Sequence, residues 1–428
     1  MLATSIIAKK RDHQRLSGDE IRFMVEGFVA GEIPDYQMSA WAMAIVCRGM
    51  EDDEIAALTD AMLASGGRLS RATDRPRVDK HSTGGLGDKV SLVLAPLLAC
   101  FDVDVPMLSG RGLGITGGTL DKLEAYPGTN CHLSQPQIDR QLEQLGCVIT
   151  GTTVDIAPAD RQLYALRDVT GTVPSIALIT SSIMSKKLAE SLDALVLDVK
   201  FGSAAFMRDV YQARQLAESL RITGERFGVS TRAVLSDMNQ PLGRMVGNAC
   251  ELNEAVQVLQ GAGPADVREL TVHLSAELLV AAGKFADCEL ASLALTKTLN
   301  SGRALARFQA MIRAQGGLFD PQLELAPSST LAATSHGWLQ QLDGQQLGQT
   351  IIGLGGGRAR LEQSIDHSVG LEMLVRVGDR IELDQPLVHI FARRPQAAEQ
   401  AARELLAAMT IVEHPVPPLP LIHTLQAA

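Results

Sequence analysis

The chain has 428 residues, 46% of them hydrophobic, and a formal net charge of −10. This composition fits a globular protein of two or three domains, and the negative charge argues against general nucleic-acid binding, which needs a broad basic surface. The six cysteines are scattered and the nine histidines do not cluster, which predicts free thiols and no metal site. The N-terminus lacks an apolar signal core and no run of about 20 apolar residues follows, so we expect a cytoplasmic protein that enters no membrane.

Residues 17–66 have the pattern of a small helical unit. Ser17 and Glu20 have the spacing of a capping box, and apolar residues then recur on one helical face. Residues 38–46 are apolar enough for a buried helix. Residues 55–63 follow three acidic residues, which favour a helix N-terminus. We therefore predict that the chain begins with helices only.

After Arg77 the sequence alternates between expected strands and helices. It reads strand, glycine-rich loop, helix, strand, second glycine-rich loop and helix. Such alternation indicates an α/β domain with a mostly parallel sheet, where ligands bind at the loops beyond the carboxyl ends of the strands. The predicted helices cover residues 90–100, 175–192 and 265–315, and the predicted strands cover 103–108, 147–150, 194–199 and 233–235.

Two glycine-rich loops carry the first functional signal. They read DKHSTGGLGDKVS and MLSGRGLGITGGTLDKLEAYPG, and one apolar segment separates them. Glycines let the backbone approach a ligand and turn N–H groups towards an oxyanion. An anion such as phosphate is the expected ligand, and further charge and donors would come from Lys80, Ser82, Thr83, Ser91, Ser109, Thr116 and Thr119.

Other interpretations of these loops are weaker. The stretch from Gly112 to Gly117 satisfies GxGxxG after a predicted strand, as in dinucleotide-binding folds. No clear acidic residue ends a strand about 20 residues later, where a ribose partner belongs.

His81, between a lysine and a serine in the first loop, could titrate near a ligand. Arg167 and Lys186 are either functional cations or ordinary solvated side chains on this reasoning.

The last hundred residues differ from the rest. After residue 325 the chain turns to short predicted strands and turns in GWLQQLDG, TIIGLGGGRAR and HSVGLEMLVRVGDRIELDQPLVHIFA. The segment VGDRIELDQPL resembles the hairpins of lipoyl- and biotinyl-type domains. No lysine stands at a hairpin tip in a modification motif, so we interpret this unit as architectural. It predicts a C-terminal α+β domain.

Six segments together carry a family resemblance: KHSTGGLGD, SGRGLGITGGTLDKLEAYPG, APADRQLYALRDVTGTVPSI, SSIMSKKLAE, LDALVLDVKFGSAAFM and SDMNQPLGRMVGNACE. They resemble the thymidine/pyrimidine-nucleoside phosphorylase family over nearly the whole chain. The resemblance implies a cleft that closes on substrate and a homodimer formed through the helical domain. It implies a helical domain over 1–66 joined by about 158–192, an α/β phosphate-binding domain over 67–157 and 193–325, and a C-terminal domain over 326–428.

The resemblance also implies a reaction and its residues. Phosphate attacks C1′ of a pyrimidine nucleoside while the glycosidic bond breaks, without a redox or organic cofactor. Arg167, Ser182 and Lys186 would hold the pyrimidine, with His81 near its O2 carbonyl. We expect His81, Arg167 and Lys186 to be the catalytic residues. Phosphate would be held by Lys80, Ser82, Ser91, Ser109 and Thr119.

Three positions depart from the family pattern. Ile115 stands where the family usually has histidine, and Ala204 where it tends to have glycine, which predicts either an apolar closure contact or a weakened enzyme. Lys89 stands where some bacterial members bind a monovalent cation. Its ammonium group could replace that cation, pairing with Glu254, so we expect activity independent of potassium. The other groups at that place match Gly87, Leu242 and Met245.

Met107 bears on sugar preference. Broad-specificity members tend to carry a lysine at this position, whereas methionine would leave a ribose 2′-hydroxyl without a partner. We therefore expect thymidine and deoxyuridine to be cleaved to the base and 2-deoxy-α-D-ribose 1-phosphate, in pyrimidine salvage or catabolism. The alternatives are a broad-specificity phosphorylase and a non-catalytic pyrimidine- or phosphate-binding homologue. A phosphoribosyltransferase of the same fold would need diphosphate and magnesium motifs, which are not visible.

Overall fold

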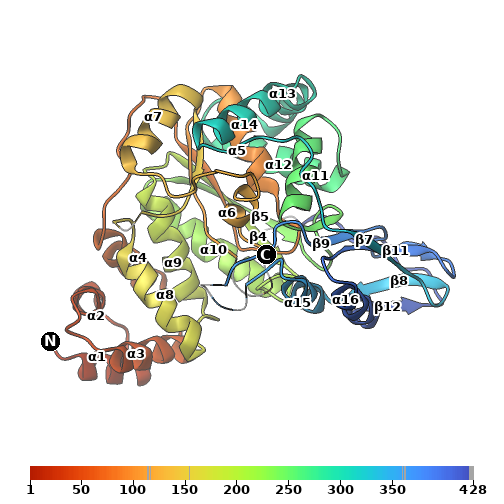
Figure 1. Cartoon of the computed structure of the whole chain (residues 1–428). Helices are drawn as coiled ribbons and strands as arrows, with labels where there is room; N and C mark the ends of the chain where they lie inside the picture. Colours follow the sequence, from red (N-terminus) through yellow and green to blue (C-terminus); the bar gives the residue numbers. More distant parts are fainter. Residues whose placement is uncertain (113–114, 116, 154, 359, 361–362, 424–428) are drawn as a thin grey trace.

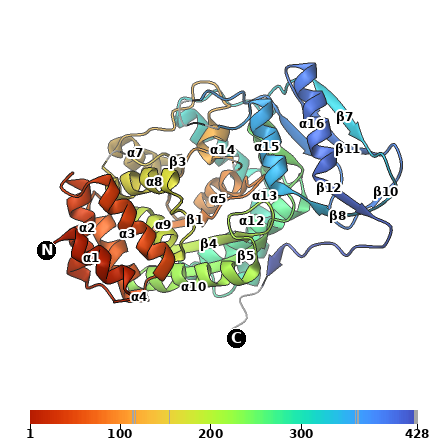
Figure 2. The ribbon, with the colours of Figure 1, turned by 90° about the horizontal axis from the view of Figure 1, so that it is seen from below.

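The computed structural model describes residues 1–112, 115, 117–153, 155–358, 360 and 363–423. The N-terminal helices lie at one end of the molecule and the C-terminal strands at the other, with the α/β part between them (Figures 1 and 2). Within the described ranges, no helix is long and apolar enough to cross a membrane.

The N-terminal end consists of helices, and two helices from the middle of the chain pack against it. Ser17 and Glu20 form the predicted capping box. Trp41 is fully buried in the core that these helices share. The helices are α1 (Ala3–Arg11), α2 (Gly18–Val29), α3 (Asp35–Arg48), α4 (Asp52–Ala64), α8 (Pro158–Thr170) and α9 (Ile176–Ala189).

The central sheet is mostly parallel, as predicted. Strands β1, β4 and β5 are parallel neighbours, and β2 pairs in parallel with β3. A bridge between Arg77 and Asp104 brings β2 beside β1. All eight residues of β4 are buried, as expected for a strand covered on both faces. The strands are β1 (Val78–Ser82), β2 (Val105–Leu108), β3 (Cys147–Thr150), β4 (Ala194–Phe201) and β5 (Ser230–Asp237).

Helices cover both faces of this sheet. Leu195 and Leu197 of β4 share a core with α10, whereas Val196 shares another core with α5 and α12. The predicted helical stretch 265–315 forms α12, α13 and α14. These helices are α5 (Val90–Leu98), α6 (Thr119–Leu123), α7 (Gln135–Leu145), α10 (Val210–Arg226), α11 (Ala249–Leu259), α12 (Ala265–Ala281), α13 (Cys288–Asn300) and α14 (Arg303–Ala314), with a 3₁₀ turn at Ala99–Phe101.

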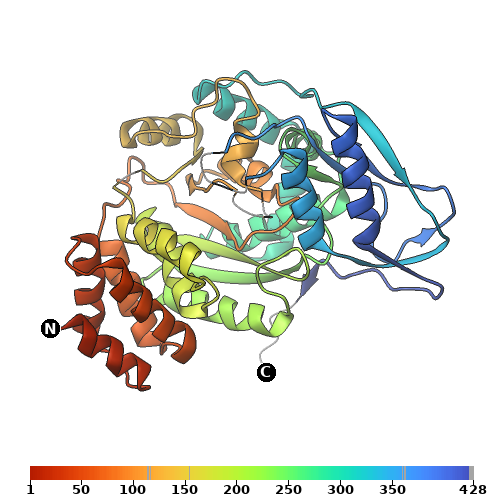
Figure 3. The ribbon, with the colours of Figure 1, turned by 60° about the horizontal axis from the view of Figure 1, so that its bottom comes forward.

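The C-terminal part is an α+β unit with two small sheets, ordered β6-β9-β11-β7 and β10-β8-β12. Helices α15 (Gly344–Leu354) and α16 (Pro395–Ala407) pack against each other, with α15 on the side facing the α/β part (Figures 2 and 3). The strands of these two sheets are β6 (Met245–Gly247), β7 (Ser328–Ala332), β8 (Gly337–Leu342), β9 (Gly370–Met373), β10 (Arg380–Ile381), β11 (Pro386–Phe391) and β12 (Met409–Val412), and β13 (Ile422–His423) follows them in the chain.

One prediction for this part is wrong. TIIGLGGGRAR was expected to form strands and turns, but its first residues lie in α15. Asp343 caps that helix by accepting from two backbone N–H groups, and Leu347 and Ile351, four residues apart, bury one face. Gly355 ends the helix in a left-handed conformation, φ +97°. The glycines of this segment suggested turns, but the chain forms a capped helix up to Leu354.

The C-terminal unit and the α/β part exchange strands. β6 precedes α11 in the chain but pairs with β9, and β13 returns to pair antiparallel with β5 of the central sheet. The two parts are therefore joined by hydrogen-bonded ladders in addition to side-chain packing. The domain limits inferred from the sequence remain predictions.

Candidate active site

The carboxyl ends of the parallel strands bring the two glycine-rich loops to one edge of the sheet. β1 continues into the first loop, with Ser82 opposite Asp198 of β4. β2 continues into the second loop, where the Ser109 N–H still pairs with β3. A bridge between Gly85 and Ala205 ties the first loop to the turn after β4. This edge is where ligands bind in open parallel sheets.

Lys80 is buried at the base of the first loop, among two carboxylates and a second lysine. Its Nζ lies 3.4 Å from Asp88 Oδ2 and 3.5 Å from Asp198 Oδ2, and Lys200 Nζ lies 2.9 Å from Asp198 Oδ2. Burial raises the pKa of Asp88, but Lys200 and Lys80 outweigh it and hold that pKa well below its usual range. Charged hydrogen bonds are normally about 2.7–2.9 Å long, so the long contacts of Lys80 leave it donor capacity for an anion.

Hydroxyl groups surround the same loop. Ser82 Oγ accepts from the Gly84 N–H at 3.1 Å, and Thr83 Oγ1 accepts from the Lys200 N–H at 2.9 Å. A hydroxyl that accepts in this way still has its own proton to donate, and the Ser82 hydroxyl is hydrogen-bonded to the Asp88 carboxylate. Ser91 is half-buried in the first turn of α5, where the unpaired N–H groups of a helix N-terminus favour an anion.

The second loop folds back on itself around Asp121. Its carboxylate Oδ2 accepts from the Gly112 N–H at 2.7 Å. A side chain at Gly118 would overlap the backbone of Gly112, so the loop closes only with glycine there. Thr119 is half-buried and begins α6. Thr116, another predicted donor, lies outside the described residues.

Lys122, which the sequence reasoning did not single out, joins the two loops. From α6 its Nζ donates to the Asp88 carbonyl of the first loop at 2.7 Å and pairs with Glu251 Oε2 at 2.7 Å. Glu251 Oε1 in turn accepts from the Gly247 N–H at 3.1 Å. The two loops are thus joined by a hydrogen bond from a buried lysine whose charge is paired with Glu251 of α11.

Arg167 is buried, so of the two interpretations that the sequence left open, that of an ordinary solvated side chain is wrong. The side chain is 1% exposed and donates to three backbone carbonyls, those of Thr172 (3.2 Å), Val173 (2.8 Å) and Leu178 (3.0 Å). Burial lowers the pKa of its guanidinium group. These bonds connect the end of α8 to the start of α9 and use three of the five guanidinium N–H groups.

Ser182 and Lys186 lie one turn apart on α9, beside Asp160 of α8. Lys186 Nζ donates to the Ser182 carbonyl at 2.6 Å and to its Oγ at 3.2 Å, and it pairs with Asp160. The structure therefore brings together two of the three predicted pyrimidine-binding residues. Asp160 was missed, although it lies in the quoted segment APADRQLYALRD.

The neighbouring Lys187 is buried and anchors α9 to the strands that carry the loops. Its Nζ pairs with Asp79 of β1, donates to the Leu108 carbonyl of β2 at 3.1 Å and lies 2.6 Å from Glu190 Oε1. Glu190 Oε1 also accepts from the Leu108 N–H at 3.2 Å. Burial and the nearby Asp79 raise the pKa of Glu190 well above its usual range. This cluster connects the predicted base-binding helix to both loops.

His81 is half-buried at the end of β1. Burial, Lys187, Lys186 and Lys80 all lower its pKa, which keeps the imidazole neutral at neutral pH. A neutral imidazole can donate one hydrogen bond but cannot act as a ready proton donor. The environment therefore favours polarisation of a carbonyl over its full protonation.

Met107 lies in an apolar environment, unlike the other residues predicted for the site. It lies in β2 opposite Ile149, is 1% exposed, and belongs to the hydrophobic core below the sheet edge. The structure does not bring it to the polar groups described above. Any influence on sugar preference would come from the absence of a polar side chain at this position.

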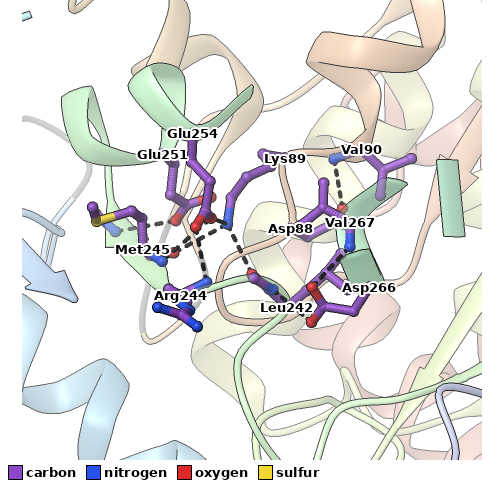
Figure 4. A network of polar contacts seen from close by, with 12 residues as sticks. Asp88, Lys89, Val90, Leu242, Arg244, Met245, Glu251, Glu254, Asp266 and Val267 are labelled. Carbon is purple, nitrogen blue, oxygen red and sulfur yellow. Dashed lines mark hydrogen bonds and ion pairs between the residues drawn. The ribbon is translucent and has the colours of Figure 1, made fainter. Parts of the chain in front are cut away.

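Lys89 lies at the centre of a buried polar network (Figure 4). Its Nζ donates to the carbonyls of Leu242 at 2.8 Å and Met245 at 3.1 Å and pairs with Glu254. Gly87 packs directly on Leu242, where a side chain would overlap the Leu242 carbonyl. Burial disfavours the charge, but Glu254 raises the pKa of Lys89, so its ammonium group is retained. The structure thus brings Lys89 to three of the four groups named for the cation position, and the fourth, Gly87, packs against Leu242.

Ile115 and Ala204 both pack against α15. A Cβ on Gly348 would lie 2.5 Å from Ile115 Cβ, and a Cβ on Gly344 would overlap Ala204 Cβ and lie 2.5 Å from its Cα. The two glycines are one helical turn apart. The two unusual positions are therefore joined through one helix of the C-terminal part, which the sequence did not indicate.

Comparisons with known proteins agree with this architecture. Family models match residues 4–66 (glycosyl transferase family, helical bundle domain), 74–305 (glycosyl transferase family, a/b domain) and 338–412 (pyrimidine nucleoside phosphorylase C-terminal domain). A crystal structure of anthranilate phosphoribosyltransferase from Thermus thermophilus has a similar fold, with a TM-score of 0.60 and 20% identity over 72% of this chain and 99% of that chain.

Two curated relatives are similar over their whole length. They are pyrimidine-nucleoside phosphorylases from two strains of Staphylococcus aureus, each 44% identical over 430 residues, or 99% of both chains. The resemblance inferred from the six sequence segments is therefore confirmed. The chain belongs to the thymidine/pyrimidine-nucleoside phosphorylase family.

Proposed function

We propose that this protein cleaves pyrimidine nucleosides with phosphate, releasing the base and a pentose 1-phosphate. The observation that carries the proposal is the pairing of two unlike sites. An anion-suited pair of loops lies at the sheet edge, and the buried cluster around Lys187 ties it to the helix of Ser182 and Lys186. The relatives of similar length are named for this activity.

The chemistry assigns a task to each group. An oxygen of phosphate bonds to C1′ while the bond from C1′ to the base nitrogen breaks, and that electron pair moves onto the base and its carbonyl oxygens. Arg167 and Lys186 would stabilise the anionic base, and neutral His81 would donate to O2. The nucleophile would be held in line by Lys80, Ser82, Ser91, Ser109 and Thr119. We propose no redox or organic cofactor, since phosphate is the co-substrate.

The direct test is ultraviolet monitoring of thymidine with and without phosphate. We expect free thymine only when phosphate is present. A His81→Ala control should lose about two to three orders of magnitude in rate, as is typical for loss of a well-placed donor. Calorimetric binding of thymine and phosphate without turnover would instead favour the non-catalytic homologue. Loss of activity with a chelator would favour the phosphoribosyltransferase alternative.

We further propose a preference for 2′-deoxynucleosides, thymidine and deoxyuridine. The support is the apolar Met107, which offers no partner to a 2′-hydroxyl. Values of kcat/KM for thymidine and uridine test this directly. Equal values would instead assign a broad-specificity phosphorylase.

We also propose a homodimer formed through the helical domain. Tyr36 and Met43 of α3 and Tyr164 of α8 are large apolar side chains exposed on helices that contact each other. Large apolar side chains exposed on neighbouring helices are typical of an interface. Light scattering of the wild type and of Tyr36→Glu should show a dimer and a weakened dimer. A monomeric wild type would refute the assembly.

A further inference from the structure

The C-terminal part reaches the second glycine-rich loop with one buried cation. Arg358 follows α15 by four residues and is 8% exposed. Its Nη1 donates to Asp121 Oδ1 at 2.6 Å, and its Nε donates to the Gln363 carbonyl at 3.0 Å. The carboxylate that Arg358 holds is the one around which the second loop folds.

Asp121 links this cation to the loop backbone. While Oδ1 accepts from Arg358, Oδ2 accepts from the Gly112 N–H at 2.7 Å. Asp121 is buried and lies on α6, two residues after Thr119, a proposed phosphate ligand. A movement of this carboxylate therefore moves both the loop backbone and the first residue of α6.

Among the described residues, the other charged partner of Asp121 is Arg111, which Asp121 shares with Glu124. Arg111 Nη1 lies 3.2 Å from Asp121 Oδ1, but both its Nη atoms also bond to Glu124. Arg111 is one-third exposed, whereas the pair of Arg358 and Asp121 is buried. A buried carboxylate without a buried cation is costly, so Asp121 would turn towards solvent if Arg358 were removed, and it would release the Gly112 N–H.

The position of Arg358 is itself fixed from two sides. Asn248 Nδ2 donates to the Gly356 carbonyl at 2.8 Å, two residues before Arg358. On the other side, α15 packs through Gly348 on Ile115 of the same glycine-rich loop. The segment between α15 and Arg358 therefore follows the loop closely, and it places the guanidinium group at the loop's base.

From this geometry we infer that Arg358 is a positioning residue of the phosphate site, contributed by the C-terminal domain. It holds Asp121, and Asp121 holds the second glycine-rich loop in the form that presents Ser109 and Thr119. The inference rests on the proposed function only for the identity of the anion. The reacting groups themselves belong to other parts of the chain.

The test compares Arg358→Gln, Arg358→Lys and Arg376→Gln with the wild type. Arg376 is the matched control because it also joins the two parts, pairing with Asp266 at 2.8 Å and donating to the Gly243 carbonyl at 3.0 Å. For R358Q we expect the calorimetric Kd and the KM of inorganic phosphate to rise tenfold or more, with the KM of thymidine within about twofold. R358K should recover part of the affinity, and R376Q should keep wild-type phosphate values whatever its melting temperature.

The possible outcomes distinguish the positioning role of Arg358 from the proposed function. Unchanged phosphate affinity in R358Q, or equal losses in R358Q and R376Q, would overturn the positioning role while leaving the proposed function intact. If R358Q does not fold, R358K and Asp121→Asn carry the test, and both must weaken phosphate binding. A wild type that binds no phosphate would refute the proposed function and this inference together.

Discussion

Replacing Lys89 by methionine tests the buried network in Figure 4 most sharply. Methionine has nearly the same length but no charge, so the Glu254 carboxylate and the carbonyls of Leu242 and Met245 lose their shared donor. Glu254 still accepts from the N–H groups of Arg244 (3.0 Å) and Met245 (3.3 Å), which compensates part of the loss. Breaking a buried ion pair by removing one partner costs about 3–5 kcal/mol, and we expect the lower end of that range.

A shorter variant, Lys89→Ala, should also acquire a response to potassium that the wild type lacks. Alanine leaves the space of the lysine side chain open, so a potassium ion can enter it, since a carboxylate and two carbonyl oxygens already converge there. A ligand that binds only the folded state stabilises it by RT ln(1 + [L]/Kd), which is about 2.7 kcal/mol at 100 times Kd. Potassium should therefore restore much of what the substitution removes.

The assay is thermal unfolding and phosphorolysis in potassium, sodium and choline chloride at equal ionic strength. A loss of about 3 kcal/mol lowers the melting temperature by roughly 6–12 °C in a domain of this size. We expect that shift in K89M in every salt, a shift in K89A that potassium partly reverses, and no difference between salts for the wild type. A wild type activated by potassium, or a K89M variant as stable as the wild type, would refute the reasoning.

Three further predictions follow from other parts of the site. Gly348→Ala should push α15 away from Ile115, because the new Cβ would lie 2.5 Å from Ile115 Cβ. This variant should raise the KM of phosphate several-fold. The control Gly353→Ala, whose Cβ would meet open space, should leave that KM unchanged. Lys187→Met should lower the free energy of unfolding by about 3–5 kcal/mol, because Asp79 stays buried and uncompensated; a urea midpoint equal to that of the wild type would contradict this. The pKa of His81 is lowered on folding, so the unfolded chain binds the additional proton and the free energy of unfolding falls as the pH drops below about 6.5. His81→Gln should reduce this pH dependence, measured by urea unfolding at about pH 5.5 and 7.5. An unchanged pH dependence would show that other groups cause it.

Much of the fold could be predicted because local pattern and tertiary structure agree. The capping box of Ser17 and Glu20, the alternation after Arg77 and the buried run of β4 each indicated the element that forms. The failure at α15 has a physical cause. Gly353 and the glycines after Leu354 are poor helix formers and made TIIGLGGGRAR look like strands and turns, whereas the helix begins six residues earlier, at the Asp343 cap, and only its last turn enters this segment.

Parts of the candidate site could be predicted at positions where the residue type suits a single chemical role. The glycine-rich loops with Lys80 and His81 indicated an anion and a titrating group, and the pairing of Lys89 with Glu254 followed from the family resemblance. Residues that act through others were missed, among them Asp160 and Lys122. Their partners, Lys186 and Glu251, are distant in sequence, so a carboxylate or an amine in a helix pattern looks like a solvated side chain until the fold brings the two together.

The central claim is that the two loops present phosphate to a nucleoside held by α8 and α9. Its most direct test is phosphorus NMR of the purified protein with thymidine and phosphate, combined with chromatography of the base. We expect free thymine and a pentose 1-phosphate in equal amounts, with neither formed when phosphate is omitted. Thymine released without phosphate, or the absence of a sugar phosphate signal while thymine accumulates, would contradict the claim.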